Sequence, residues 1–568
     1  MMERRQILAI VLMFLILAVY QIFYVERFQR KRSTGRKPPA TAEAPRKAPE
    51  RPPAPPMPSG VEFPTQPSPV TGEKTVRVLT SLFEVTFSNR GAALTSWRLR
   101  KYPLAPGDKS KGLVDLVPAG GRALLVTFDD PVMRRASTEG LYGVSAGGLE
   151  LSRGVPSGEL SFTYAGPEGS QIVKRFTFHD DKYAFILDLY VKRPDGSTMP
   201  LDHRVLWAYG LGGGGASYGD YTTVSHLIGQ KRAKDKPGKL PPLTVHKGAA
   251  AWSAIQTKYF TAILAPRSGT AAAAVAQRTR QKSVTKTTWT FQKRTTVRKV
   301  AELAPALAYT PSADTAREQI LVFGGPKLPP RLKAYGAGIE RVIDYGWFGP
   351  ISRPLLQGLR FLNGFVGNYG VAIVLLTIII KMAFFPLSIK QQQNMRQMSK
   401  LQPKLKTLQE RYKNDKQKLN QEVMALYKRE KVNPLGGCLP MLIQFPVIIA
   451  LYRVLGDALE LRGAPFVLWI TDLSVPDSLF VPWFHVLPVM MGVTMLLQNH
   501  ISPASAMGGA AVDPRQQQMF KYMPIIFLFI FWGFPAGLNL YWTVYTIIGI
   551  AEQLIIKRHL APEEAKSS

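Results

Sequence analysis

The sequence predicts a multi-domain membrane protein with six transmembrane α-helices, a large exported all-β sandwich and a cytoplasmic helical hairpin. Long uncharged apolar runs occur near the start of the chain and throughout its last third. Between these regions, polar and apolar residues alternate as in soluble β-structure. The formal net charge is +33, which suits an anionic membrane face, nucleic acid or an acidic partner.

Residues 1–32 contain the first predicted span. The run from Ile7 to Val25 carries no charge over 19 residues, about 28 Å as a helix. No small-x-small cleavage site follows it, which favours an uncleaved signal anchor over a signal peptide. Residues 33–75 hold twelve prolines among small and charged residues, so we expect an extended linker.

Residues 76–328 predict the β-sandwich. Short alternating runs bounded by Gly, Pro, Asp or Asn recur more than ten times, as in a large antiparallel sandwich. The segment "GASYG" matches the G-x-S-x-G elbow around Ser217, but no helical pattern follows, which favours a surface turn over a hydrolase. No P-loop, H-E-x-x-H or cysteine-based metal spacing occurs, and Cys438 is the single cysteine. We therefore expect no enzymatic activity, no cofactor, no metal site and no intrachain disulfide.

Residues 329–364 predict an amphipathic helix at the outer membrane interface. Leu355, Leu359 and Leu362 fall on one side, while Arg353 and Arg360 fall elsewhere. Packing of the same apolar side against the bundle is an alternative.

Residues 365–558 are expected to form the membrane core, and residues 559–568 are expected to form a short cytoplasmic tail. Pro535 and Gly537 are expected to break the helix between the last two spans and form a tight turn. The five core spans are expected at 365–386, 439–455, 480–498, 522–536 and 538–556.

Residues 387–433 predict a cytoplasmic hairpin of two helices. They carry twelve Lys/Arg against four Asp/Glu, whereas residues 456–479 carry one Arg against four acids. The positive-inside rule then places both termini in the cytoplasm and the β-domain outside, although the basic segment after the first span alone would favour the opposite orientation. The basic face of the hairpin is either a solvated surface or a contact for ribosomal RNA, anionic lipid or a targeting factor.

Lys381 is a candidate functional cation because it lies well inside the second predicted span. Snorkelling of its side chain to the interface is the alternative. Thr377 lies one turn away on the same face, and the last span carries a second polar stripe. That stripe consists of Asn539, Thr543, Thr546 and Gln553, and Gln444 adds an amide in the third span. Buried polar groups must face one another or water, so these stripes are expected to line a hydrated cavity.

Several segments resemble one protein family closely. "VNPLGGCLPMLIQFPVIIALY", "GNYGVAIVLLTIIIKMAFFPL" and "FPAGLNLYWTVYTI" are similar to the YidC/Oxa1/Alb3 membrane protein insertases, in the Gram-negative YidC form. The resemblance implies a five-helix insertase core, an added N-terminal anchor and a periplasmic β-domain in the bacterial inner membrane. It also implies insertion and folding of nascent inner-membrane proteins, alone or with the Sec translocon.

The resemblance further implies a groove open to the cytoplasm and to lipid. Its buried arginine corresponds here to Lys381, a tyrosine of the last span corresponds to Tyr541, and Trp542 stands where a second tyrosine is common. The family's substrate-contacting helices correspond to the segments that contain Met441, Phe445, Ile526, Phe529 and Ile530. Expected partners are nascent membrane proteins, the lipid bilayer, and the ribosome or the signal recognition particle pathway through the basic hairpin. A small-solute transporter with a periplasmic receptor domain is the alternative, but internal repeat symmetry is not evident.

Overall fold

The computed structural model describes most of the chain after the proline-rich segment. The described residues are 70, 72–106, 108–166, 171–192, 202–207, 210–212, 222–235, 243–268, 271–289, 293–309, 315–430, 432, 439–479, 484–501 and 514–560. The predicted first span, most of the predicted linker, Ser217 and the 559–568 tail beyond Leu560 lie outside the described residues.

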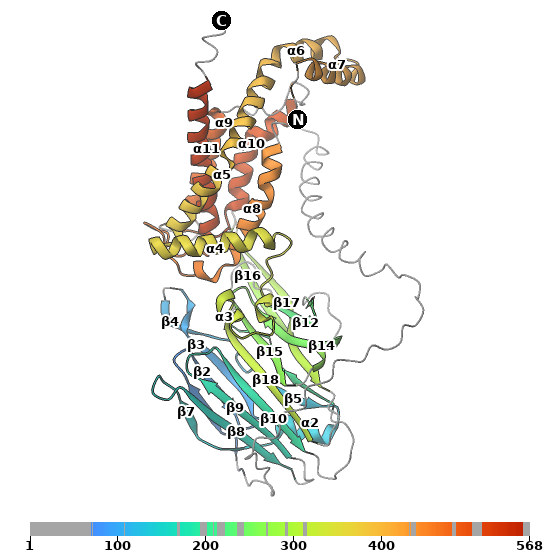
Figure 1. Cartoon of the computed structure of the whole chain (residues 1–568), viewed down its shortest axis with the longest axis vertical. Coiled ribbons are helices and arrows are strands. Elements are labelled where there is room, and N and C mark those ends of the chain that lie inside the picture. Colours follow the sequence, from blue (N-terminus) through green and yellow to red (C-terminus); the bar gives the residue numbers. More distant parts are fainter. Residues whose placement is uncertain are drawn as a thin grey trace, which may run out of the picture. The chain divides into compact units, whose positions relative to one another are not determined.

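The β-domain is built from two sheets (Figure 1). One has five strands in the order β4-β3-β2-β1-β7, and the other has thirteen, in the path β5-β11-β17-β16-β14-β15-β18-β10-β9-β8-β6. Beside this path, β12 pairs with β14, and β13 pairs with β12. The strands are β1 Thr75–Leu79, β2 Phe83–Ser88, β3 Ala93–Ala105, β4 Asp108–Asp115, β5 Leu125–Phe128, β6 Gly143–Val144, β7 Gly148–Glu150, β8 Ser157–Ala165, β9 Gln171–His179, β10 Ala184–Lys192, β11 His203–Leu206, β12 Thr223–Ile228, β13 Lys231–Asp235, β14 Leu243–Gln256, β15 Phe260–Ser268, β16 Ala271–Trp289, β17 Lys293–Tyr309 and β18 Thr315–Pro326.

The two sheets share one hydrophobic core. Inward-facing residues alternate with outward-facing ones, for example in the buried-intermediate pattern of β2. Trp97 of the smaller sheet stacks on Phe185 of the larger one with ring centroids 5.0 Å apart, and Phe87 lies 4.7 Å from Phe176. Aromatic pairs across the layers therefore hold the sandwich together.

The domain departs from the expected all-β antiparallel sandwich in a helix among the strands and in one parallel strand pair. The helix α2, Pro131–Glu139, interrupts the strands because the Asp130 carboxylate accepts a hydrogen bond from the Met133 amide at 2.7 Å and Pro131 occupies the first turn. Strand β1 pairs with β7 in parallel, whereas its pairing with β2 is antiparallel.

Residues 329–344 belong to the β-domain core, although the sequence groups them with the interfacial helix. They form α3, Pro329–Lys333, and a 3-10 turn η1, Ile339–Val342. Leu332, Ile339 and Val342 are buried in the same cluster as the sheet residues. The amphipathic helix proper is α4, Gly349–Val366, which buries Leu356 and Leu359.

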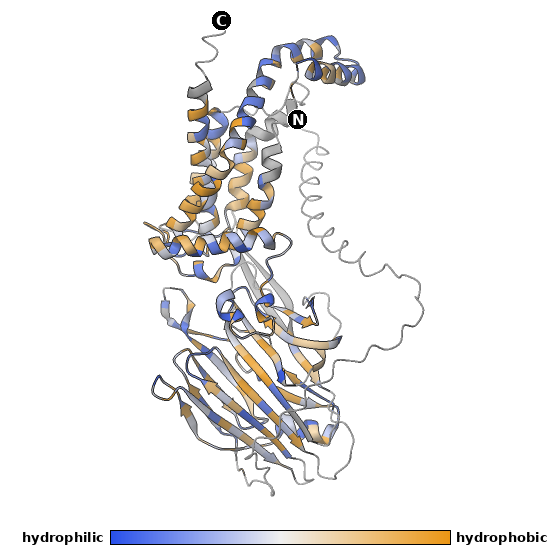
Figure 2. Ribbon diagram, viewed as in Figure 1, coloured by the Kyte–Doolittle hydropathy of each residue, from blue (hydrophilic) through white to orange (hydrophobic). Residues whose placement is uncertain are grey.

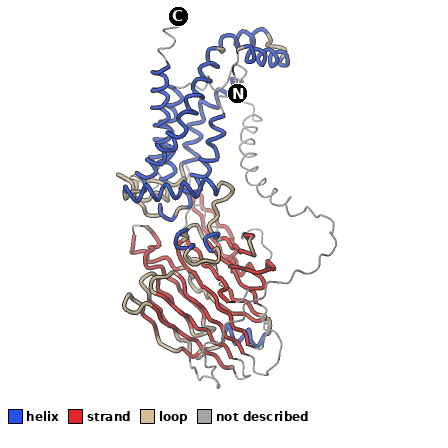
Figure 3. The backbone as a smooth tube through the Cα atoms, in the orientation of Figure 1, coloured by secondary structure: helices blue, strands red, loops and turns tan. Residues whose placement is uncertain are grey.

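The remaining helices follow α4 in the second half of the chain. Figure 3 shows them in blue, as it does all helices, with the strands in red. They are α5 Tyr369–Lys400, α6 Gln402–Arg411, α7 Lys416–Arg429, α8 Leu439–Asp457, α9 Val486–Ile501, α10 Pro514–Phe531 and α11 Ala536–Leu560, with a 3-10 turn η3 at Leu459–Leu461. Hydrophobic residues predominate along α9, α11 and the first part of α5, whereas the end of α5, α6 and α7 are mainly hydrophilic (Figure 2). Among the described residues, α5 is the one helix long and apolar enough to cross a membrane by length and composition.

Helices α5, α8, α9, α10 and α11 form a bundle with one core. That core includes Ile373, Leu451, Met491, Phe531 and Leu540, one residue from each helix. Each helix contributes an apolar face to the centre, as expected of a bundle.

Most helix boundaries differ from those of the predicted spans, and the causes are visible for α5 and α9. Helix α5 begins at Tyr369, where the Asn368 side chain accepts hydrogen bonds from two backbone amides, and it continues through Pro386 to Lys400. Helix α9 begins at Val486 because the Asp477 carboxylate accepts from the amides of Val486 and Leu487, each at 2.9 Å.

Gly537 does not break the helix as the sequence predicts. It lies inside α11, and the turn is formed by the residues up to Pro535. The Gly537 amide donates to the Leu473 carbonyl at 2.9 Å, and an added Cβ would lie 3.2 Å from that oxygen. Glycine at this position permits a close approach of the two backbones.

Helices α6 and α7 form a hairpin with its own small core. Leu401, Leu405, Val423 and Leu426 are buried together, and they occur at helical spacing in the sequence. The Asp415 carboxylate caps α7 by accepting from the Lys418 amide at 3.0 Å.

Candidate functional site in the helical bundle

The centre of the candidate site is Lys381 on α5. Its side chain is buried, with 6% of the residue exposed, and its Nζ lies 2.9 Å from Glu552 Oε2 on α11. The ammonium also lies 3.9 Å from the centroid of the Tyr545 ring. A buried cation needs an opposite charge, and an aromatic face adds attraction. The predicted functional cation is therefore part of an ion pair in this structure.

The surface of α11 that receives Lys381 is formed by Tyr545, Gly549 and Glu552, at spacings of four and three residues on one helical face. An added Cβ at Gly549 would lie 3.4 Å from Lys381 Nζ and 2.7 Å from Gln498 Nε2 of α9. The absence of a side chain at Gly549 thus allows the ammonium and the amide to approach the α11 backbone.

Gln444 of α8 joins this site through Tyr545. The Tyr545 hydroxyl donates a hydrogen bond to Gln444 Oε1 at 2.7 Å. Helices α5, α8 and α11 are thereby linked through the Tyr545 ring and its hydroxyl, because the same ring faces Lys381. The hydrogen bond to Gln444 and the cation–π contact with Lys381 together fix the position of the Tyr545 ring.

The predicted threonines satisfy much of their hydrogen-bonding capacity within the bundle. Thr377 donates to the Ile373 carbonyl at 2.7 Å, and Thr543 donates to the Asn539 carbonyl at 2.8 Å, each one turn back in its own helix. The hydroxyls of Thr494 and Thr546 lie 2.8 Å apart and connect α9 with α11. Thr377, Thr543 and Thr546 are buried, but none of the hydrogen bonds described for them reaches Lys381.

Asn539 and Tyr541 lie toward the other end of α11. The Asn539 amide donates to the carbonyls of Phe531 and Phe534, both at 3.3 Å, and so braces the turn between α10 and α11. Asn539 Oδ1 and the Tyr541 hydroxyl are buried without a hydrogen-bond partner among the described residues. A buried polar atom left unpaired is unfavourable by about 1–3 kcal/mol, so these two atoms favour a polar neighbour.

Trp542 belongs to an aromatic cluster rather than to the polar site. Its ring lies 5.7 Å from Phe531, 5.9 Å from Tyr541 and 5.9 Å from Tyr545, measured between centroids. It therefore packs α11 against α10 on one side of the site.

The predicted substrate-contact residues form an exposed apolar surface in part. Ile526, Phe529 and Ile530 of α10 are exposed, with 56% of Phe529 accessible, and Phe445 of α8 is exposed as well. The three α10 residues follow the i, i+3, i+4 pattern of one helical face. Met441 lies in α8, but its side chain is outside the described set.

Sequence reasoning missed Glu552 and Gly549. Glu552 is the one acidic residue within the five predicted core spans. Because a buried cation needs a carboxylate partner, this position could have been predicted from the sequence. Nothing in the sequence alone indicated that the glycine would face the lysine.

The comparisons with known proteins agree with this architecture. The family model for the 60Kd inner membrane protein matches residues 361–564, and the model for the YidC periplasmic domain matches residues 75–357. The fold and these matches define a membrane protein that joins a helical bundle to a periplasmic β-rich domain.

Curated relatives extend over nearly the whole chain. The membrane protein insertase YidC of Geobacter sulfurreducens is 34% identical over 501 residues, covering 86% of this chain and 87% of the relative. The protein of the same name from Syntrophus aciditrophicus is 33% identical over 572 residues, covering 98% and 100%. A crystal structure described as an active YidC insertase with its first transmembrane domain resolved shares 19% identity, with a TM-score of 0.34 and coverage of 85% and 92%. The chain belongs to the YidC family.

Proposed function

We propose that this chain inserts nascent proteins into the bacterial inner membrane and assists their folding. The relatives named above are called membrane protein insertases, and this name favours insertion over the transport of small solutes. The structural observation that supports the proposal most is the buried Lys381–Glu552 pair, in a bundle whose helix α10 also has an exposed apolar face.

The proposed topology has six spans with both termini in the cytoplasm. Helix α5 has the length and composition of a span, and α9 and the segment Tyr522–Phe531 are shorter apolar helices. The basic composition of residues 387–433 supports a cytoplasmic position for α6 and α7. The β-domain then lies in the periplasm.

The proposed site separates two parts of a substrate. A short polar tail enters the bundle and one of its carboxylates takes the place of Glu552 on Lys381 Nζ. The apolar segment of the same substrate lies against Ile526, Phe529 and Ile530 and passes from there into lipid. The Asn539 and Tyr541 oxygens offer further polar contacts along the path.

The driving force comes from burial and from the membrane potential. Transfer of apolar surface out of water contributes about 25 cal/mol per Å², and a negative tail gains about 2.3 kcal/mol per charge per 100 mV. No chemical turnover is needed for this step. The lysine can bind one carboxylate oxygen through a single point charge, whereas an arginine would offer a planar fork.

The basic hairpin is the proposed contact for the ribosome or the signal recognition particle pathway, and the Sec translocon is a proposed partner in the membrane. The hairpin has an apolar interior at Leu405 and Val423, so its charged residues are left at the surface. Lys404 is paired with Glu430 at 2.6 Å in this structure. Cations on such a surface attract phosphate groups of RNA or lipid.

Reconstituted vesicles test the proposal. Lys381→Glu is expected to abolish insertion of a single-span substrate, because it places a second carboxylate beside that of Glu552. Lys381→Arg is expected to retain insertion. Equal insertion by the unaltered protein and both variants would contradict the proposed role of the cation. Solute flux through vesicles that contain the protein without substrate would instead support the transporter alternative.

A further inference from the structure

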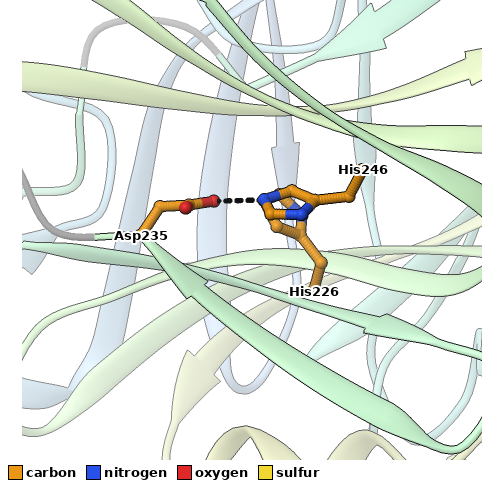
Figure 4. A group of neighbouring side chains, drawn as sticks. All are labelled: His226, Asp235 and His246. Carbon is orange, nitrogen blue, oxygen red and sulfur yellow. Dashed lines mark hydrogen bonds and ion pairs between the residues drawn. The ribbon is translucent and has the colours of Figure 1, made fainter. Parts of the chain in front are cut away.

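The β-domain contains a cluster of three potential metal ligands far from the helical site in the sequence. His226 of β12, Asp235 of β13 and His246 of β14 direct their side chains toward one point (Figure 4). Asp235 Oδ2 lies 3.2 Å from His226 Nε2 and 2.9 Å from His246 Nε2. All candidate ligand atoms lie within 4.8 Å of one another.

We propose that His226 Nε2, His246 Nε2 and Asp235 Oδ2 bind one Zn²⁺ ion. Imidazole nitrogen and carboxylate oxygen are ligands of this metal, with bonds of about 2.0–2.2 Å. A tetrahedron with such bonds separates neighbouring ligand atoms by about 3.3 Å. The two nitrogen-to-oxygen distances are close to this value, so a small outward movement of the ligands admits the ion.

Hydrogen bonding around the cluster supports a ligand role for His226. Its Nδ1 lies 2.9 Å from Ser253 Oγ, on the strand residue directly opposite it. With the ion bound, Nδ1–H would donate to Ser253 Oγ, and Nε2 would direct its lone pair to the metal in place of its present contact with Asp235. Metal-binding histidines commonly have such a partner on the other ring nitrogen.

The backbone brings His246 to this place by a sharp change of direction in β14. Ser253 lies seven residues beyond His246, and a straight strand would separate those positions by about 23 Å. The rings of His226 and His246 are nevertheless 5.0 Å apart between centroids. The β14 pairing shifts register between Lys247 and Ala250, and Gly248 within that shift has φ +120°. The bulge therefore shapes the site.

The nearby basic residues do not oppose a cation at this point. Side chains alternate along β13, so Arg232 and Lys234 lie on the opposite face from Asp235. Both pair there with Asp344, at 2.7 Å and 3.1 Å. Asp235 thus remains available to the two histidines.

The site would hold three adjacent strands together and keep one metal position open. His226 is fully buried, whereas the His246 side chain is 25% exposed, so an ion reaches the cluster from the His246 side. Three protein ligands leave a fourth tetrahedral position for water or for a side chain of another protein. A contiguous-motif search of the sequence cannot find this site, because its ligands come from three strands.

The test uses the full-length protein in detergent, purified through a tag without histidine and stripped with a chelator. We expect one Zn²⁺ per chain by elemental analysis after dialysis, and a visible absorption spectrum of tetrahedral intensity when Co²⁺ is added instead. His246→Ala and Asp235→Asn are expected to lower metal affinity at least tenfold. His179→Ala, at a histidine of the same domain outside the cluster, is expected to bind as the unaltered protein does.

Thermal unfolding of the β-domain separates metal binding from misfolding. Zn²⁺ should raise the melting temperature of the unaltered protein and of His179→Ala but not of His246→Ala, whose metal-free melting temperature should match that of the metal-free unaltered protein. Less than a tenth of an equivalent of Zn²⁺ on the unaltered protein would overturn the proposal. Equal Zn²⁺ binding by His246→Ala and Asp235→Asn would also overturn it, because the metal would then be held elsewhere.

Discussion

The Lys381–Glu552 pair can be tested by neutralising each partner separately and then both together. Lys381→Gln leaves a buried carboxylate without its cation, and Glu552→Gln leaves a buried ammonium without its anion. The double variant leaves two amides of similar size. Stability and insertion should respond differently to these three changes if the pair is structural while the cation is functional.

The geometry sets the expected size of the stability effect. At 2.9 Å and an effective dielectric constant of ~20, the attraction between the two charges is about 6 kcal/mol, opposed by the desolvation of both groups. Removal of one partner from a buried pair is unfavourable by about 3–5 kcal/mol. We expect each single variant to lose stability in this range and the double variant to lose less than either one.

Insertion should follow the lysine alone. A charge-assisted hydrogen bond contributes about 1.5–3 kcal/mol, which corresponds to roughly a tenfold to hundredfold preference for an acidic tail over its amide counterpart. Glu552→Gln is expected to keep or increase this preference because it removes the competing carboxylate. Lys381→Gln and the double variant are expected to lose it.

The assay measures protease-protected substrate in proteoliposomes, with matched substrates that carry Asp or Asn in the tail. Melting temperature in detergent is recorded for every variant, and insertion is compared at a temperature where all of them are folded. A double variant that regains the preference for the Asp tail would refute the reasoning, because stability of the pair would then explain the whole effect.

Three further predictions follow from single positions. Gly549→Ala should retain insertion, because the added Cβ meets only the flexible end of the Gln498 side chain. Gly549→Leu should abolish the preference for an acidic tail, because the larger side chain displaces Lys381. The same proteoliposome assay measures both variants, and equal insertion by the two would contradict the close packing at Gly549. Phe529→Asn should weaken crosslinks between α10 and the apolar segment of the substrate without changing the melting temperature, since the side chain is exposed. Unchanged crosslinks would show that the substrate does not pass along α10. Burial lowers the pKa of the Lys174 ammonium to about 7, so the folded chain binds fewer protons there than the unfolded chain above that pH. The unfolding free energy relative to Lys174→Met should therefore rise from pH 7 to pH 9 in denaturant titrations, and a flat or falling difference would contradict the shift.

Local patterns in the sequence predict much of the fold. The apolar runs indicate the helices of the bundle, and the alternating runs indicate the β-domain. The helical spacing of Leu401, Leu405, Val423 and Leu426 indicates the two helices that bury them. These signals work because they depend on side chains within one element.

Helix boundaries set by distant groups are not predictable in the same way. The start of α9 depends on the Asp477 carboxylate, which lies nine residues before the first helical amide that it binds. The predicted second span ends at Pro386, but α5 continues to Lys400, because a proline removes one backbone hydrogen bond and the remaining ones hold the helix together.

The candidate site shows the same division. The position of Lys381 in an apolar run indicates a buried functional cation, but Glu552 lies 171 residues away and only the packing of α5 on α11 brings them together. The predicted threonine stripes are present, yet backbone carbonyls one turn back satisfy Thr377 and Thr543. Residue type reveals polar positions, whereas their partners depend on tertiary structure.

The most direct measurement places a photoreactive phenylalanine at Gln498, beside Lys381, or at Phe529 on the exposed face of α10. A stalled nascent chain with an acidic tail is then crosslinked in vesicles. Crosslinks from position 498 to the tail and from position 529 to the apolar segment are expected, with the first lost in Lys381→Gln and the second retained. Tail crosslinks at position 498 that persist unchanged in Lys381→Gln would contradict an interior cation that receives the polar part of the substrate.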